Sequence, residues 1–162
     1  HDEVYFVTSQ PEDAGWMTPE SWSAKGDLNV LREAFTGFHS EVQNLLRACP
    51  EVHKWALLER DPLPRWSEGC VALLGDACHP MTPYMAQGAA SALEDAAVLS
   101  RCLGDVGGGI AQALRRYEAT RKPRASQIQG ASRTNTWMRN ATDPTWVYGY
   151  DAFTTPLLEP QD

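Results

Sequence analysis

An α/β fold is predicted for this chain of 162 residues from three observations. Residues 71–74 form an apolar run of strand length, and the small-residue segment 88–103 has the composition of a helix. Two shorter stretches, 28–38 and 42–49, carry apolar residues at helical spacing. The order strand, loop, helix is the one in which α/β proteins present a ligand to the carboxyl end of a strand and to a helix N-terminus.

The remaining elements each have local support in the sequence. β-branched and aromatic residues predict strands at the start of the chain and again before the central strand. N-cap residues introduce two amphipathic helices, and a long helix follows the glycine run, with Pro123 expected to kink it or to break it near Lys122. The expected ranges are 4–8 and 55–58 for the strands, 27–37 and 40–50 for the short helices, and 110–140 for the long helix.

Composition excludes several classes of function. The net charge of −7 argues against a nucleic-acid binder or a protein that binds anionic membranes. No apolar run reaches membrane-spanning length, and no segment resembles a signal peptide. The cysteines at 49, 70, 78 and 102 show no disulfide framework and are expected to be free thiols of a cytoplasmic protein. The adjacent Cys78 and His79 lack a second ligand pair at zinc spacing, so no metal site is expected.

The strand–loop–helix segment carries the candidate binding chemistry. Asp76 follows the strand, where its carboxylate can accept hydrogen bonds from a hydroxylated ligand; the alternative is an ordinary turn or N-cap aspartate. Gly88, Ala89 and Ala90 place unpaired backbone N–H groups at the positive end of a helix dipole, without bulky side chains. A single helix and turn could therefore offer both a hydrogen-bond acceptor and a set of donors to one ligand.

Two segments near the carboxyl end are interpreted as structural. Arginine is frequent in the first half of the long helix, and a solvated face paired with acidic neighbours is favoured over phosphate binding. The arginines concerned are Arg115, Arg116, Arg121 and Arg124. The aromatic segment 146–150 fits either a homodimer contact or a buried anchor within the same chain.

The segment 75–89, Gly-Asp-Ala-Cys-His-Pro-Met-Thr-Pro-Tyr-Met-Ala-Gln-Gly-Ala, resembles the second FAD-binding motif of the class A flavoprotein aromatic hydroxylases. This family contains the salicylate and p-hydroxybenzoate hydroxylases, and within the family the sequence of the motif is most similar to that of the 6-hydroxynicotinate 3-monooxygenases. The likeness extends to residues 1–9 and 143–151. It implies that residues 1–67 end a substrate-binding domain, that 68–104 are the returning strand and helix of a Rossmann-like FAD domain, and that 105–162 form a C-terminal helical tail.

The resemblance also implies an activity. FAD would be reduced by NADH or NADPH and would react with O2 to hydroxylate a small aromatic or N-heteroaromatic hydroxy acid. The implied FAD contacts are Gly75, Asp76, Pro83, Gly88, Ala89 and Ala90. The implied catalytic residues are His1, Tyr5 and Pro83, and the implied substrate contacts are His1, Tyr5 and Tyr84. Many members of the family carry glycine where this chain has Met85 and asparagine where it has Ala90, which suggests a more apolar pocket wall.

The first FAD motif of that family, a Gly-x-Gly-x-x-Gly turn around the pyrophosphate, does not occur in the 162 residues. The chain is therefore expected to be the C-terminal part of a hydroxylase, with the N-terminal part of the same protein as its partner. Alone, it is expected neither to retain FAD tightly nor to hydroxylate a substrate. The alternatives are a non-catalytic binding module that keeps the flavin-side scaffold and a related flavoprotein reductase.

Overall fold

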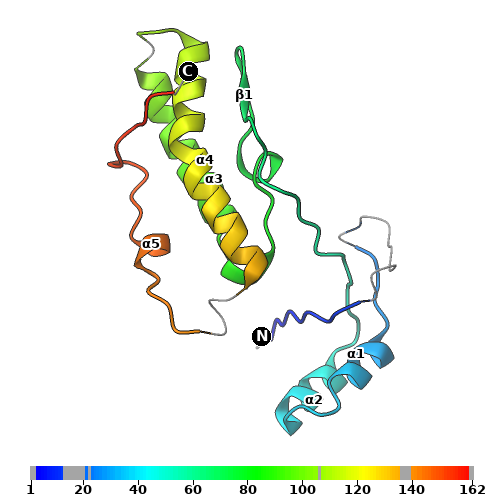
Figure 1. Cartoon of the computed structure of the whole chain (residues 1–162). Helices are drawn as coiled ribbons and strands as arrows, with labels where there is room; N and C mark the ends of the chain where they lie inside the picture. The colour runs from blue at the N-terminus through cyan, green and yellow to red at the C-terminus, as the bar shows by residue number, and fades with distance from the viewer. Residues whose placement is uncertain (1–2, 13–20, 22, 106, 136–139, 161–162) are drawn as a thin grey trace. The chain divides into compact units, whose positions relative to one another are not determined.

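The computed structural model describes residues 3–12, 21, 23–105, 107–135 and 140–160. The chain divides into two units, His1–Leu57 and Leu58–Asp162. Among the described residues, the first unit contains two short helices, and the second contains a β-hairpin, two 3-10 turns and three helices. Figure 1 shows the course of the chain in each unit. The two helices of the first unit and the two long helices of the second lie where the sequence predicts them.

The first unit is built on the helices α1 (Leu28–Ala34) and α2 (Ser40–Ala48). Asp27 caps α1 as expected, because its Oδ1 accepts a hydrogen bond of 2.7 Å from the Asn29 amide. The N-cap of α2 is His39, one residue before the Ser40 that the sequence suggests. The guanidinium of Arg32 on α1 donates to the carbonyl of Leu46 at 3.1 Å and to two further carbonyls near the end of α2. This side chain closes the α2 C-terminus and joins the two helices.

The strands expected in the first unit and at its end are absent from the described residues. Residues 4–8 and 55–58 are not assigned to strands, and in the described part of this unit a bridge joins Lys25 to His53. The side chain of Tyr5 is 88% exposed, and its hydroxyl donates to Glu3 at 2.8 Å. A β-rich composition predicts a strand only where a neighbouring strand completes its hydrogen bonds, and no such neighbour is present among the described residues.

The second unit is organised around α3 (Gly88–Gly104) and α4 (Ile110–Thr134), which pack side by side (Figure 1). One apolar cluster lies between these helices and the hairpin, and includes Trp66, Val98 and Tyr117. A second cluster joins Met85 to Ile128 of α4 and to Val147 of the tail. The loop 78–87 between the hairpin and α3 is therefore packed near both of its ends, through Cys78 in the first cluster and Met85 in the second.

The central strand is shorter than the predicted run 71–74. Strand β1 (Ser67–Glu68) pairs antiparallel with β2 (Val71–Ala72) across a turn in which Gly69 has a φ of +58°. Val71 is 67% exposed, so one apolar side chain of this strand is uncovered in the described chain. The hairpin is attached to α4, since the amide and hydroxyl of Ser67 donate to Glu118 at 2.9 and 2.7 Å.

Helix α4 runs without a break from Ile110 to Thr134, with Pro123 inside it. The prediction of a break near Lys122 is wrong. Proline removes one intrahelical hydrogen bond, but buried residues lie on both sides of it, among them Tyr117 and Ile128. The packing of both halves of the helix, Tyr117 in the first apolar cluster and Ile128 in the second, outweighs the lost bond and keeps one continuous helix.

The tail after α4 is anchored within its own chain. It contains the short helix α5 (Thr145–Tyr148), whose Val147 is buried against α4. The Arg124 side chain donates to the carbonyls of residues 146 and 147 at 2.7 and 2.8 Å, and its guanidinium carbon lies 4.0 Å from the centre of the Tyr150 ring. Arg101 of α3 donates to the carbonyls of residues 152 and 155. The structure thus shows internal anchoring for segment 146–150, and a homodimer contact through this segment stays a prediction.

All four cysteines are free thiols, as the sequence indicates. Across the described parts of the chain, no helix combines the length and the apolar character that a membrane span requires.

Replacing Arg124 by methionine should lower the free energy of unfolding by about 2 kcal/mol, because several charge-assisted hydrogen bonds are lost together. The measurement is urea unfolding followed by circular dichroism. Arg115, which is exposed on the same helix, is the control, and Arg115→Met should leave stability almost unchanged. Equal losses in the two variants would contradict the role given to Arg124.

Candidate functional site

The candidate site begins at the 3-10 turn η1 (Gly75–Ala77), where the backbone is tightly constrained. Gly75 has a φ of +60°, and a Cβ built on it would lie 3.1 Å from the Cβ of Ala92 on α3. Its carbonyl accepts from the amides of Cys78 and His79 at 3.0 and 2.9 Å. Its amide donates to the Asp95 carboxylate at 3.1 Å. Only glycine fits this close approach, and both polar atoms of its backbone are bonded.

The turn brings Asp76 to the first residue of α3. A Cβ built on Gly88 would lie 3.9 Å from Oδ1 of Asp76. Asp76 also lines a concavity of about 310 Å³ together with residues of its own turn and loop and with the segment 58–60. The other lining residues are Leu58, Glu59, Arg60, Ala77 and Pro80. The carboxylate and the helix start therefore lie next to one another at the surface.

The N-terminus of α3 is open to a ligand. Gln87 is the N-cap residue, but its side chain makes no capping hydrogen bond and instead donates to the Met85 carbonyl at 3.3 Å. The first turn contains no acidic side chain. The first amides of a helix have no intrahelical acceptor, so those of Gly88, Ala89 and Ala90 are available to an acceptor on a ligand.

The loop before α3 is fixed by α4. The Gln129 side chain donates to the Pro80 carbonyl at 2.9 Å, and the hydroxyls of Thr82 and Ser132 are 2.9 Å apart. Pro83 begins the 3-10 turn η2 (Pro83–Met85) and is exposed, while Tyr84 is half-buried. Both residues lie at the surface on a loop with rigid attachments, where a ligand could contact them.

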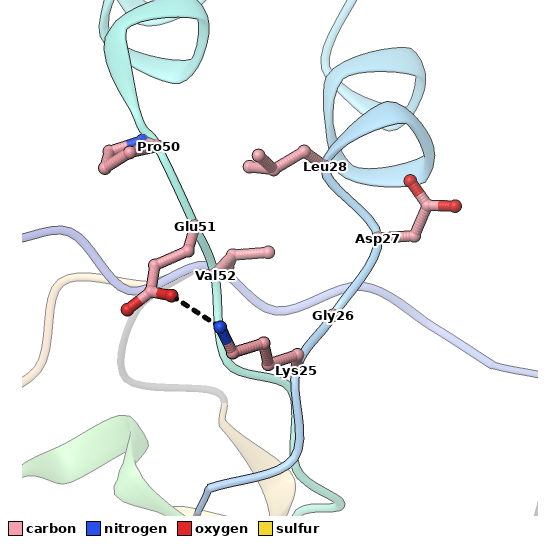
Figure 2. A pocket seen from close by; sticks show the side chains of 7 residues that line it. All are labelled: Lys25, Gly26, Asp27, Leu28, Pro50, Glu51 and Val52. Atoms are coloured by element: carbon pink, nitrogen blue, oxygen red, sulfur yellow. Dashed lines mark hydrogen bonds and ion pairs between the residues drawn. The ribbon is translucent and has the colours of Figure 1, made fainter.

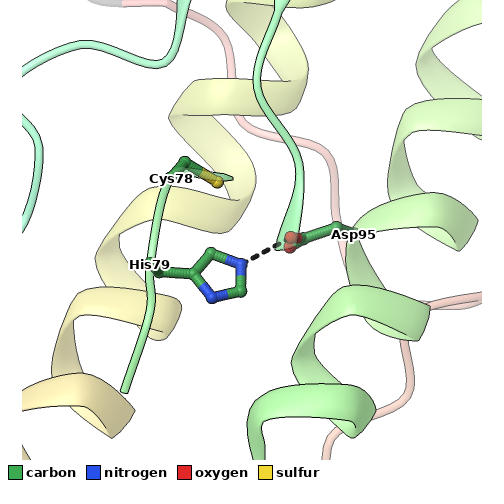
Figure 3. Close-up of side chains that lie close together, drawn as sticks. All are labelled: Cys78, His79 and Asp95. Atoms are coloured by element: carbon green, nitrogen blue, oxygen red, sulfur yellow. Dashed lines mark hydrogen bonds and ion pairs between the residues drawn. The ribbon is translucent and has the colours of Figure 1, made fainter. Parts of the chain in front are cut away.

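Below the loop lies a fully buried polar cluster that sequence reasoning missed. His79, Asp95 and Arg121 are each at most 1% exposed. The Nε2 of His79 lies 2.6 Å from Oδ2 of Asp95 (Figure 3). The Nε of Arg121 lies 2.8 Å from Oδ1 of the same carboxylate. A second Arg121 nitrogen pairs with Glu94 at 2.7 Å.

The prediction that Arg121 belongs to a solvated face is wrong. Buried residues recur along α4 at intervals of three or four, and position 121 lies on that stripe. The stripe contains Leu114, Tyr117, Arg121, Ala125, Ile128 and Ser132. This periodicity was the signal that could have identified Arg121, because an arginine on an apolar stripe requires a buried acid.

The charges of the cluster favour an ionised Asp95. Burial alone would raise the pKa of its carboxyl, but the hydrogen bonds from His79 and Arg121 outweigh burial and hold that pKa below its ordinary value. Burial raises the pKa of the Cys78 thiol to about 12. This thiol donates to the Gly75 carbonyl and is neither a nucleophile nor a thiolate ligand at neutral pH.

Cys78, His79 and Asp95 bring three potential metal-ligand atoms within 4.8 Å of one another (Figure 3). The chemistry of the donors argues against a metal. The Asp95 carboxylate already accepts hydrogen bonds from three groups, and the Arg121 guanidinium supplies the positive charge that a cation would bring. Because zinc prefers thiolate over thiol, we assign no metal to this cluster.

A further concavity lies in the first unit, between the segments 25–28 and 50–52 (Figure 2). Lys25 and Glu51 face one another across it and form an ion pair of 2.9 Å. The backbones are joined by a hydrogen bond of 2.8 Å from the Gly26 amide to the Val52 carbonyl. Because Lys25 and Glu51 are already paired with one another, we assign no ligand to this concavity.

The residues expected to contact the substrate are distributed over the two units and the undescribed N-terminus. His1 lies outside the described residues. Tyr5 belongs to the first unit and has no strand neighbour, whereas Pro83 and Tyr84 belong to the second. The structure brings together the expected cofactor contacts Asp76 and Gly88, and it leaves the expected substrate contacts as predictions.

Comparison with known proteins identifies the family. Residues 20–132, which include the turn, the loop and both long helices, match the family model described as FAD binding domain. The chain belongs to this family.

Sequence identity to individual proteins supports the resemblance to FAD-dependent aromatic hydroxylases. The chain is 53% identical over 163 residues to 6-hydroxynicotinate 3-monooxygenase of Pseudomonas fluorescens and 35% identical over 133 residues to salicylate hydroxylase of Pseudomonas putida. These alignments cover 99% and 80% of this chain. They cover only 41% and 31% of the relatives, so the chain spans less than half of their length.

Solved structures confirm the α/β fold class. A salicylate hydroxylase substrate complex matches with a TM-score of 0.73 and 29% identity, over 85% of this chain and 38% of that one. HpxO of Klebsiella pneumoniae, in complex with FAD and uric acid, matches with a TM-score of 0.59 and 32% identity, over 76% of this chain and 33% of that one. The described chain is thus similar to part of the FAD-dependent hydroxylase fold.

Asp95→Asn should remove about 3 kcal/mol from the free energy of unfolding at neutral pH, because it leaves a buried guanidinium without its charge partner. A carboxyl whose pKa is lowered on folding stabilises the protein above its unfolded pKa, and this contribution is lost as the pH falls through the folded value. The difference between wild type and Asp95→Asn should therefore be constant above about pH 4 and shrink below it. Denaturant unfolding from neutral pH to pH 3 measures it.

The matched control is Asp105→Asn. Asp105 caps the other end of α3 and pairs with Arg116 of α4 at 2.9 Å, but its side chain is largely exposed. This variant should lose far less stability. A difference between wild type and Asp95→Asn that grows as the pH falls would contradict an ionised, hydrogen-bonded Asp95.

Proposed function

We propose that this chain is the C-terminal part of an FAD-dependent monooxygenase that hydroxylates a small aromatic or N-heteroaromatic hydroxy acid, using NADH or NADPH and O2. The observation that carries the proposal is the placement of the Asp76 carboxylate beside Gly88 at the uncapped start of α3. FAD contains a sugar-alcohol chain rich in hydroxyls and a ring edge that gains negative charge on reduction. One acceptor and one helix N-terminus are what these two parts require.

The residues would hold FAD in named roles. The Asp76 carboxylate would accept a hydrogen bond from a ribityl hydroxyl, and the amides of Gly88, Ala89 and Ala90 would serve the ring edge that gains negative charge on reduction. Pro83, exposed on the loop, would border the oxygen-transfer pocket. The helix dipole contributes about 0.3–2 kcal/mol toward the reduced, anionic form. When bound, FAD supplies the redox and oxygen chemistry, and this chain supplies position and electrostatics.

The substrate side of the proposal rests on the resemblance. His1 and Tyr5 would contact the aromatic acid and assist loss of the ring hydroxyl proton, which activates the ring for electrophilic attack. Tyr84, next to Pro83, is the third proposed contact. The identity of 53% to 6-hydroxynicotinate 3-monooxygenase favours an N-heteroaromatic hydroxy acid as the substrate class.

The partner proposed for this chain is the preceding part of the same protein. It would carry the pyrophosphate-binding turn, and it would cover apolar side chains that the described structure leaves exposed. These side chains are Val71, Leu74, Leu93 and Leu103. We further propose that residues 1–67 end the substrate domain, that 68–104 belong to the FAD domain and that 105–162 form the tail of a cytoplasmic enzyme. The exposed ring of Tyr148 on that tail is the proposed homodimer contact.

The full-length protein should be purified with flavin absorbance and should oxidise NADH or NADPH in the presence of its substrate. The assay compares 6-hydroxynicotinate, salicylate and 4-hydroxybenzoate, with product analysis by mass spectrometry. A hydroxylated product from one of them is the expected result. A colourless protein would favour the non-catalytic module, and flavin reduction without any hydroxylated product would favour the reductase.

The isolated chain should bind FAD about a hundredfold more weakly than the full-length protein, because one or two charge-assisted contacts to the pyrophosphate, each worth about 1.5–3 kcal/mol, are missing. Isothermal titration with FAD measures both affinities. Equal affinities would show that this chain contains the whole cofactor site and would refute the proposed division of the site.

A further inference from the structure

Three segments that are far apart in the sequence meet at one buried carboxylate. Oδ2 of Asp95 on α3 accepts from the Gly75 amide at 3.1 Å and lies 2.6 Å from Nε2 of His79. Oδ1 accepts from the Nε of Arg121 on α4 at 2.8 Å. All three side chains are almost completely buried. Asp95 thus joins the η1 turn, the loop after it and both long helices.

Charge balance defines the role of His79 in this group. The carboxylates of Glu94 and Asp95 are opposed by the guanidinium groups of Arg121 and Arg124. Two negative charges meet two positive ones, so the cluster needs no third cation. Within the described chain, Nδ1 of His79 has no hydrogen-bond partner. The contact of Nε2 with Oδ2 of Asp95 therefore orients the His79 ring toward the carboxylate.

The same carboxylate controls the residue next to the cofactor. Gly75 is adjacent to Asp76 in the chain, and its amide is held by Asp95 while its carbonyl is held by the amides that follow the turn. Among the described residues, the Asp76 carboxylate has no ion-pair partner that would fix its direction. Its orientation toward Gly88 therefore depends on the backbone of the turn.

We propose that Asp95 is a positioning residue for the cofactor: it sets the η1 turn through the Gly75 amide, and so aims the Asp76 carboxylate at the ribityl chain of FAD. His79 and Arg121 keep the Asp95 carboxylate ionised and correctly oriented. This inference rests on the proposed function, in which Asp76 contacts FAD. According to this inference, Asp95 contributes measurably to FAD affinity although it is buried behind the turn.

A double-mutant cycle in the full-length protein tests the proposal. The FAD dissociation constant is measured by quenching of flavin fluorescence for wild type, Asp76→Ala, Asp95→Asn and the double variant, each shown to be folded by circular dichroism. Each single change should weaken FAD binding about tenfold or more, as expected for loss of a charge-assisted hydrogen bond. The double variant should be no weaker than the weaker single variant, because both changes remove the same contact.

The outcomes separate this inference from the proposed function. If the losses of FAD affinity in the two single variants add up in the double variant, or if Asp95→Asn keeps the wild-type affinity, the positioning role of Asp95 is overturned. In that case the proposed function still stands, provided that the wild-type protein binds FAD. Wild-type protein without affinity for FAD would overturn the proposed function, and the inference with it. Asp105→Asn is the control and should keep the wild-type affinity, since Asp105 lies at the opposite end of α3.

A second pair of variants decides the matter if Asp95→Asn does not fold. His79→Gln keeps an N–H donor directed at Asp95, whereas His79→Leu removes it and keeps the bulk. The glutamine variant should retain FAD affinity within about threefold, and the leucine variant should lose about tenfold or more. Equal affinities in the two variants would overturn the proposal.

Discussion

The ionised carboxylate of Asp95 inside the second unit is the interaction on which the rest of the site depends. A carboxylate without partners would be costly to bury, so this one can exist only because Arg121 supplies the opposite charge and His79 a further hydrogen bond. Its remaining capacity holds the Gly75 amide. A buried carboxylate needs hydrogen-bond donors, and one of the donors to Asp95 is the Gly75 amide. Satisfying the buried charge therefore also fixes the turn that carries Asp76.

Helix α4 supports the site along its C-terminal half. Arg121 reaches into the buried cluster, Gln129 and Ser132 hold the loop before α3, and Arg124 holds the tail. The loop is thereby pinned to a long helix rather than left as a free connection. This matters for a flavin site, because the cofactor contacts must keep their positions while the flavin changes its charge.

The sequence predicts the local part of the site and misses the non-local part. A strand end, a loop and a helix start lie close together by chain connectivity, which is why the proximity of Asp76 and Gly88 is predictable. The partner of Arg121 comes from another helix, and its charge alone suggested solvent. The strands expected at 4–8 and 55–58 failed for a related reason: their composition is local, but a strand needs a partner from elsewhere in the chain, and none lies among the described residues.

The most direct test of the account is a crystal structure of the full-length protein with FAD bound. The account predicts a ribityl hydroxyl within about 3.2 Å of the Asp76 carboxylate, which is hydrogen-bonding distance, and the flavin N1–C2=O edge facing the amides of Gly88 to Ala90. The Gly75 amide should remain bonded to Asp95. FAD bound elsewhere, with Asp76 directed into solvent, would contradict it.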